Sequence, residues 1–162
     1  MTAFVLNRRN LLVAGGSVLA AGTSGLLLPA RAEGLAPTPS MPGGANNYTK
    51  GAKIVERIGK GGFWMTGTVR RAGDGSPLAG QRVHIWAHTV EGQEHEPQSH
   101  GATLTDKNGV FRLEMPQIIP IFGQPHGHLA YDSGEFKTVF LRPVMKSAKE
   151  TSLEAHFVLQ SA

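Results

Sequence analysis

From residue 63 onward, short β-forming runs alternate with turn residues, and this pattern constrains the fold most. Runs rich in Val, Ile, Thr and Phe are separated by turns every eight to twelve positions. Asn108-Gly109 suits a tight hairpin, because both residues adopt the positive φ angles that such a turn requires. Short strands at this spacing predict an all-β fold, a β-sandwich of about seven short strands. The expected strands are 63–71, 82–90, 101–105, 110–114, 126–131, 136–142 and 155–160.

The first 32 residues have the three parts of an export signal. Paired arginines at 8–9 precede an apolar, uncharged stretch at 11–28, and Ala-Arg-Ala at 30–32 offers the small residues that signal peptidase needs. A membrane anchor would need about 20 strongly apolar residues, whereas this stretch is diluted by Gly and Ala. We therefore expect 1–32 to be a twin-arginine signal peptide. The expected partner during export is the twin-arginine translocase, and the mature protein is expected to be periplasmic or secreted, with no stable membrane span after cleavage.

The remaining chain is nearly neutral and has no cysteine. Three of the sixteen basic residues and none of the twelve acidic ones lie in 1–32, which leaves a net charge of +1. No clustered basic footprint suggests a nucleic-acid partner. Pro, Gly and Asn dominate 33–50, which predicts a flexible linker before a sandwich domain at 51–162. Without cysteine, a metal site would need His, carboxylate, Tyr or backbone ligands.

Six of the seven histidines lie between residues 84 and 128. His126 and His128 are two apart on an expected strand, so their side chains share a face, with Cα atoms about 6.6–7 Å apart. Two imidazoles at that spacing can bind one metal ion. His84 and His88 are four apart, roughly 13 Å in an extended strand, too far for one ion unless the strand is bulged. These two, like His156, are expected to be exposed polar residues.

A polar loop at 91–100 could complete the site. It carries three carboxylates and two histidines, and functional residues often lie on loops held by a rigid sheet. Glu94 or His95 is the expected further ligand, because two imidazoles and one carboxylate form a common non-haem iron site. The alternative is that Glu91, Glu94 and Glu96 simply make the loop acidic and solvated.

Five motifs stand out over about residues 63–160. They are Gly-Thr-Val at 67–69, Asp-Gly-Ser-Pro-Leu-Ala-Gly at 74–80, Val-His-Ile-Trp-Ala at 83–87, Thr-Asp-Lys-Asn-Gly-Val-Phe at 105–111 and His-Gly-His at 126–128. Together they resemble the catalytic domain of intradiol ring-cleavage dioxygenases. These β-sandwich enzymes, such as protocatechuate and catechol dioxygenases, hold ferric iron by two tyrosines and two histidines. The resemblance implies iron as cofactor, dioxygen and a catechol or related small aromatic as substrates, and support of the site by Trp86.

The tyrosine ligands of that family are missing here. One of them stands eight residues after the tryptophan, where this chain has Glu94. Tyr48 lies near the expected linker, and Tyr131 is three residues past His128, so it should point to the opposite face of the sheet. The expected centre therefore has two histidines and a carboxylate, and it could hold Fe(II), Cu or Zn as well as Fe(III).

Three functions are consistent with these observations. The first is an exported, iron-dependent oxygenase of intradiol type, with His126 and His128 as ligands, Glu94 or His95 completing the shell, and Glu94 and Trp86 as the expected catalytic residues. The second is a non-catalytic periplasmic sandwich that binds a metal or ligand, for example as an accessory subunit. The third is a structural sandwich whose histidines are incidental.

Overall fold

The computed structural model describes residues 34–162, so the predicted signal peptide at 1–32 lies outside the described residues. It confirms an all-β sandwich with seven strands and one short 3-10 turn, η1, at Pro97–Ser99. No helix in 34–162 is long and apolar enough to cross a membrane. The strands are β1 (Phe63–Arg71), β2 (Arg82–Ala87), β3 (His100–Leu104), β4 (Val110–Met115), β5 (Gly127–Tyr131), β6 (Val139–Leu141) and β7 (Ser152–Leu159).

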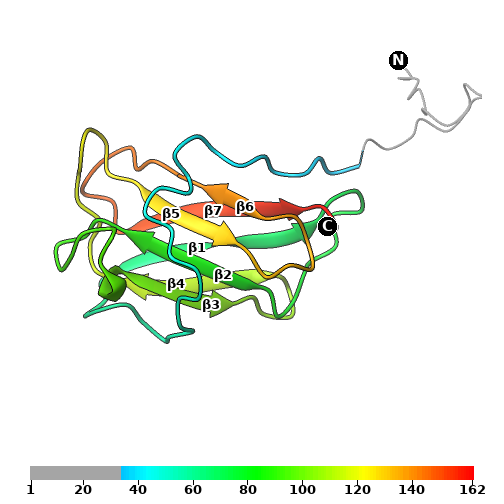
Figure 1. Ribbon diagram of the computed structural model, residues 1–162, viewed down its shortest axis with the longest axis horizontal. Helices are drawn as coiled ribbons and strands as arrows, with labels where there is room; N and C mark the ends of the chain where they lie inside the picture. Colours follow the sequence, from blue (N-terminus) through cyan, green and yellow to red (C-terminus); the bar gives the residue numbers. More distant parts are fainter. Residues whose placement is uncertain (1–33) are drawn as a thin grey trace, which may run out of the picture. The chain divides into compact units, whose positions relative to one another are not determined.

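The strands form two sheets that pack as layers (Figure 1). One sheet has the order β4-β1-β7, with β1 and β7 parallel, and the other has the antiparallel order β3-β2-β5-β6. Buried and more exposed residues alternate along β1 and β7, so one face of that sheet supplies the core. Gly67 is required where the two strands meet, because a Cβ there would lie 1.6 Å from the carbonyl oxygen of Ala155.

Strands β2 and β5 are buried on both faces. The inner face carries the expected apolar residues, whereas the outer face carries His84 and Trp86, both fully buried. The expectation that His84 is exposed is therefore wrong, and His88 is partly buried. His156 on β7 is exposed as expected, with 53% of its side chain accessible.

The segment 34–50 covers this outer face, which corrects the expectation of a flexible linker at 33–50. It runs beside β6 and across β5 and β2 (blue to cyan in Figure 1). Main-chain hydrogen bonds hold it: Thr38 N donates to Val158 O and Met41 N to Phe140 O. Pro and Gly prevent regular secondary structure, but they leave the remaining main-chain groups free to pair with a neighbouring strand.

Candidate metal centre

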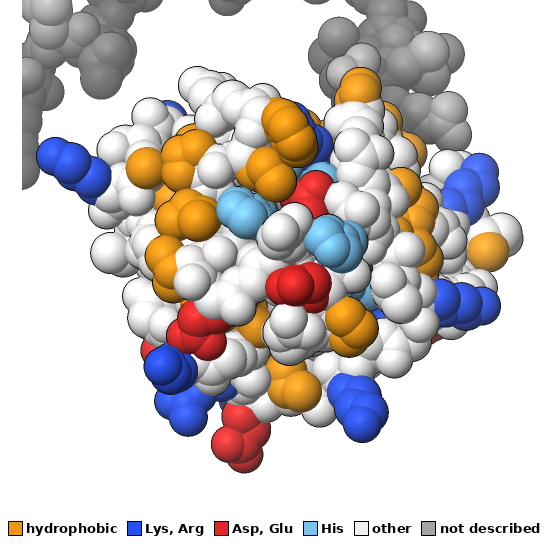
Figure 2. All heavy atoms as spheres, turned by 60° about the vertical axis from the view of Figure 1, so that its left-hand side comes forward, with side chains coloured by type: hydrophobic (Ala, Val, Ile, Leu, Met, Phe, Trp, Pro, Cys, Tyr) orange, Lys and Arg blue, Asp and Glu red, His pale blue; other side chains and the backbone are white. Residues whose placement is uncertain are grey.

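Glu94, His126 and His128 come together where β2 ends and β5 begins. The Oε2 of Glu94 lies 3.3 Å from Nε2 of His128 and 3.7 Å from Nε2 of His126. The three ligand atoms all lie within 4.8 Å of one another. Ligands about 2.1 Å from one metal ion lie roughly 3–3.4 Å apart, so the two distances from Glu94 are close to those of a metal centre. Figure 2 shows histidine and acidic side chains gathered at this end of the molecule.

Backbone carbonyls orient both histidines. Nδ1 of His126 lies 2.9 Å from the carbonyl oxygen of Gln124, and Nδ1 of His128 lies 3.1 Å from that of Gly44. A carbonyl oxygen can only accept, so Nδ1 of His128 carries the proton and its Nε2 directs a lone pair inward. The Arg142 guanidinium also lies 3.3 Å from Nδ1 of His126, where it adds positive charge beside the ring. Such outer contacts orient the histidine ligands of metal sites.

Two inward atoms of the group are buried without a hydrogen-bond partner, Oε2 of Glu94 and Nε2 of His128. Buried polar atoms are rarely left unpaired, because their desolvation is costly. Burial lowers the pKa of His128 below its usual value, so the ring is neutral near pH 7 and does not form an ion pair with Glu94. A cation between these atoms would satisfy both, and the nitrogen and oxygen donors fit iron, zinc or copper.

Trp86 supports the site but supplies no ligand. Its ring is stacked between two imidazoles, 5.1 Å from the ring centre of His128 and 5.6 Å from that of His100. Its Nε1 donates a 2.9 Å hydrogen bond to the carbonyl oxygen of Asn46. The contacts fix the plane of the His128 ring, so Trp86 acts as a positioning residue.

Of the two further ligands considered in the loop, the structure brings only Glu94 to the histidines. His95 is exposed and is not part of the group. Sequence reasoning missed His100, whose Nε2 lies 2.8 Å from the carbonyl oxygen of Glu94 and whose Nδ1 lies 3.0 Å from Nε2 of His84. The density of histidines in 84–128 was the available signal for this pair.

Neither tyrosine places its oxygen in the group. Tyr131 packs against Phe136 in the core, on the face opposite His128, as expected. Tyr48 packs against Trp86, and its hydroxyl donates a hydrogen bond to Asp132. Burial and this hydrogen bond raise the pKa of Tyr48 to about 12, so the phenol remains protonated at neutral pH.

We therefore predict that the ferric protein lacks the red-brown tyrosinate charge-transfer band that the resemblance to intradiol enzymes would imply. The visible absorption spectrum of the Fe(III)-loaded protein checks this, with Tyr48→Phe as a matched variant. A band in the wild type that disappears in Tyr48→Phe would show that Tyr48 does reach the metal.

Stability should fall in acid because His84 is buried. Burial lowers the pKa of His84 to about 4, and the charges of His100 and Arg82 act in the same direction. The unfolded chain, with a histidine pKa near 6.5, takes up this proton more readily. The free energy of unfolding should therefore fall by about 3 kcal/mol from this residue as the pH drops from about 6.5 to about 4. Urea unfolding of wild type and His84→Asn across this range measures it, and equal pH dependence in both would contradict it.

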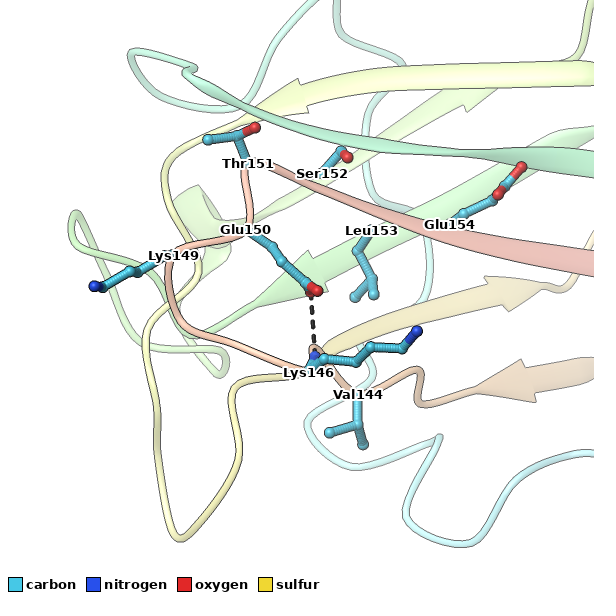
Figure 3. A pocket seen from close by; sticks show the side chains of 8 residues that line it. All are labelled: Val144, Lys146, Lys149, Glu150, Thr151, Ser152, Leu153 and Glu154. Atoms are coloured by element: carbon cyan, nitrogen blue, oxygen red, sulfur yellow. Dashed lines mark hydrogen bonds between the residues drawn. The ribbon is translucent and has the colours of Figure 1, made fainter.

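Two pockets lie beside the elements of the site. One of about 430 Å³ has His100 in its wall, with Lys50, Lys53, Val55 and Pro97. The other, about 650 Å³, is lined by residues between Val144 and Glu154, and Figure 3 shows Lys149 directed away from the other labelled side chains. Neither pocket wall contains Glu94, His126 or His128, and the first pocket is connected to the group through His100.

No protein-family model matches the sequence, and no curated protein is similar to it in sequence. Solved structures are similar in fold. Hydroxyquinol 1,2-dioxygenase from Pseudomonas putida DLL-E4 has a TM-score of 0.58 and 12% identity, over 79% of this chain and 68% of that one. 3-Chlorocatechol 1,2-dioxygenase from Rhodococcus opacus 1CP has a TM-score of 0.58 and 15% identity, and the match covers 80% of this chain and 74% of that one.

A dioxygenase domain from Streptomyces sp. SirexAA-E, part of a dioxygenase carbohydrate-binding protein fusion, has a TM-score of 0.58 and 13% identity. The match covers 78% of this chain and 99% of that domain. At these identities the likeness concerns the fold alone, and it agrees with the resemblance of the sequence motifs. The chain therefore has the β-sandwich fold of the intradiol dioxygenases.

Proposed function

We propose that this chain is an intradiol-type oxygenase that binds iron through Glu94, His126 and His128 and acts on a catechol or another small aromatic diol. The observation that carries the proposal is the convergence of these three side chains, two of them with unpartnered buried atoms, within this fold. Two histidines and one carboxylate are a common ligand set of non-haem iron oxygenases.

The side chains have distinct parts in this proposal. Iron, when bound, would supply the Lewis acidity and redox chemistry that allow an aromatic diol to react with dioxygen. The carbonyls of Gln124 and Gly44 orient the rings of His126 and His128. Glu94 is the one carboxylate among the three ligands, so it supplies the anionic oxygen donor to the metal ion.

A pocket of about 430 Å³ lies beside His100, with apolar walls from Val55 and Pro97, and its volume is in the range of small-molecule sites. His100 connects its wall to the main-chain carbonyl of Glu94, and none of the three proposed ligand side chains lines it. We also propose that the protein acts in the periplasm or outside the cell, on the strength of the twin-arginine pattern at 8–9.

Oxygen uptake with catechol tests the proposed activity. Iron-loaded wild type should consume oxygen and form a ring-opened product, whereas Glu94→Gln should be inactive because it lacks the anionic ligand. His156→Gln, on the other sheet, should match the wild type. Iron-loaded wild type that consumes no oxygen with catechol or related diols would favour the second candidate, a metal-binding sandwich without turnover, which the missing tyrosine ligands also suggest.

A further inference from the structure

We infer that residues 41–48 form a strap that positions the metal ligands, and that Asn47 is a positioning residue for Glu94. The inference rests on the proposed metal site and concerns a segment whose composition predicted only a linker. It assigns a function to side-chain and main-chain groups that are not themselves ligands.

The strap makes a separate contact to each of three parts of the site. The carbonyl oxygen of Gly44 lies 3.1 Å from Nδ1 of His128 on β5. The carbonyl oxygen of Asn46 accepts the hydrogen bond of the Trp86 indole on β2, as described above. Nδ2 of Asn47 donates a 2.6 Å hydrogen bond to Oε1 of Glu94 on the loop after β2. Three of the four residues 44–47 thus reach groups 40 to 84 positions away in the chain.

The shape of the strap is set by its own turns. Within it, Gly44 N donates to Met41 O, Asn46 N to Gly43 O and Tyr48 N to Ala45 O. Asn47 has a φ of 57°, a conformation that Asn adopts more readily than most residues other than Gly. The backbone conformation and the amide hydrogen bond therefore both favour asparagine at this position.

The contact from Asn47 determines which oxygen of Glu94 is available to an ion. With Oε1 engaged by the amide, Oε2 faces the two Nε2 atoms, 3.3 and 3.7 Å away. Without the amide, the carboxylate would be free to rotate, and each binding event would have to fix it again. Loss of such an outer contact typically weakens metal binding 10- to 100-fold.

Titration of the metal-free protein with Co²⁺, followed by its visible absorption, tests this inference. We expect Asn47→Gly, which keeps the φ angle and removes the amide, to weaken Co²⁺ binding about 10- to 100-fold. Asn108→Gly is the matched control, because it makes the same change at an exposed asparagine in the turn before β4, outside the strap. It should bind Co²⁺ nearly as wild type does. Urea unfolding without metal should show similar stability for the two variants.

Three results would overturn the inference. Wild-type affinity in Asn47→Gly, or an equal loss in both variants, would show that the Asn47 amide does not position Glu94, and the metal site itself would stand. A wild-type protein that binds no Co²⁺ would overturn the metal site together with the strap. Failure of catechol turnover alone leaves the Co²⁺ result unaffected, so the two proposals fail separately.

Discussion

His128→Ala should lose the ability to hold one metal ion per chain. The substitution removes a ligand that is 1% exposed, is stacked on Trp86 and lies 3.3 Å from Glu94. Only two protein ligands would remain. The free energy of metal binding at structural sites with four ligands is about 10–16 kcal/mol, or roughly 3 kcal/mol per ligand. The affinity for the metal ion should therefore fall more than about 100-fold.

Metal titration of His128→Ala beside His156→Ala measures this effect. His156 is exposed and lies on β7 in the other sheet, so its loss should leave the affinity unchanged. His128→Ala that retains wild-type affinity in a folded protein would mean that the metal is bound elsewhere.

Trp86→Ala should lower the free energy of unfolding of the metal-free protein by about 3–5 kcal/mol. The indole is fully buried, lies between His128 and His100, and donates a hydrogen bond to Asn46. Its removal would leave a cavity on the outer face of β2, and the carbonyl of Asn46 in the strap would lose its hydrogen-bond donor.

The control for this effect is Trp64→Ala. Trp64 lies on β1 and is 36% exposed, and the Arg112 guanidinium lies over its ring, 4.5 Å from the ring centre. It should lose clearly less stability, because it leaves no enclosed cavity. Urea unfolding compares the two variants, and equal losses would contradict the assigned role of Trp86.

Strand periodicity predicted most of the fold. The bounds of β1 agree with the expectation, because alternation and turn residues both mark its ends. The last hairpin agrees less well: β6 is confined to Val139–Leu141, and Phe136 instead forms an isolated bridge with Ser161. Alternation also could not predict that His84 is buried, because it shows which face a residue occupies and not what covers that face.

The candidate site was predicted in part. Spacing placed His126 and His128 on one face of a strand, since the period of a strand is two. It could not choose between Glu94 and His95, because neighbouring loop residues have no fixed period. The contacts of the Gly44 and Asn46 carbonyls with the site could not be predicted, because every residue has a main-chain carbonyl. Asn47 gave no signal because its partner is 47 positions away.

Metal content of the untagged protein, measured by mass spectrometry after isolation from cells, tests the central claim most directly. The account predicts about one iron per chain in the wild type and little in His128→Ala. Folded wild-type protein that carries no metal would contradict it, because Glu94, His126 and His128 would then be a buried polar cluster without an ion.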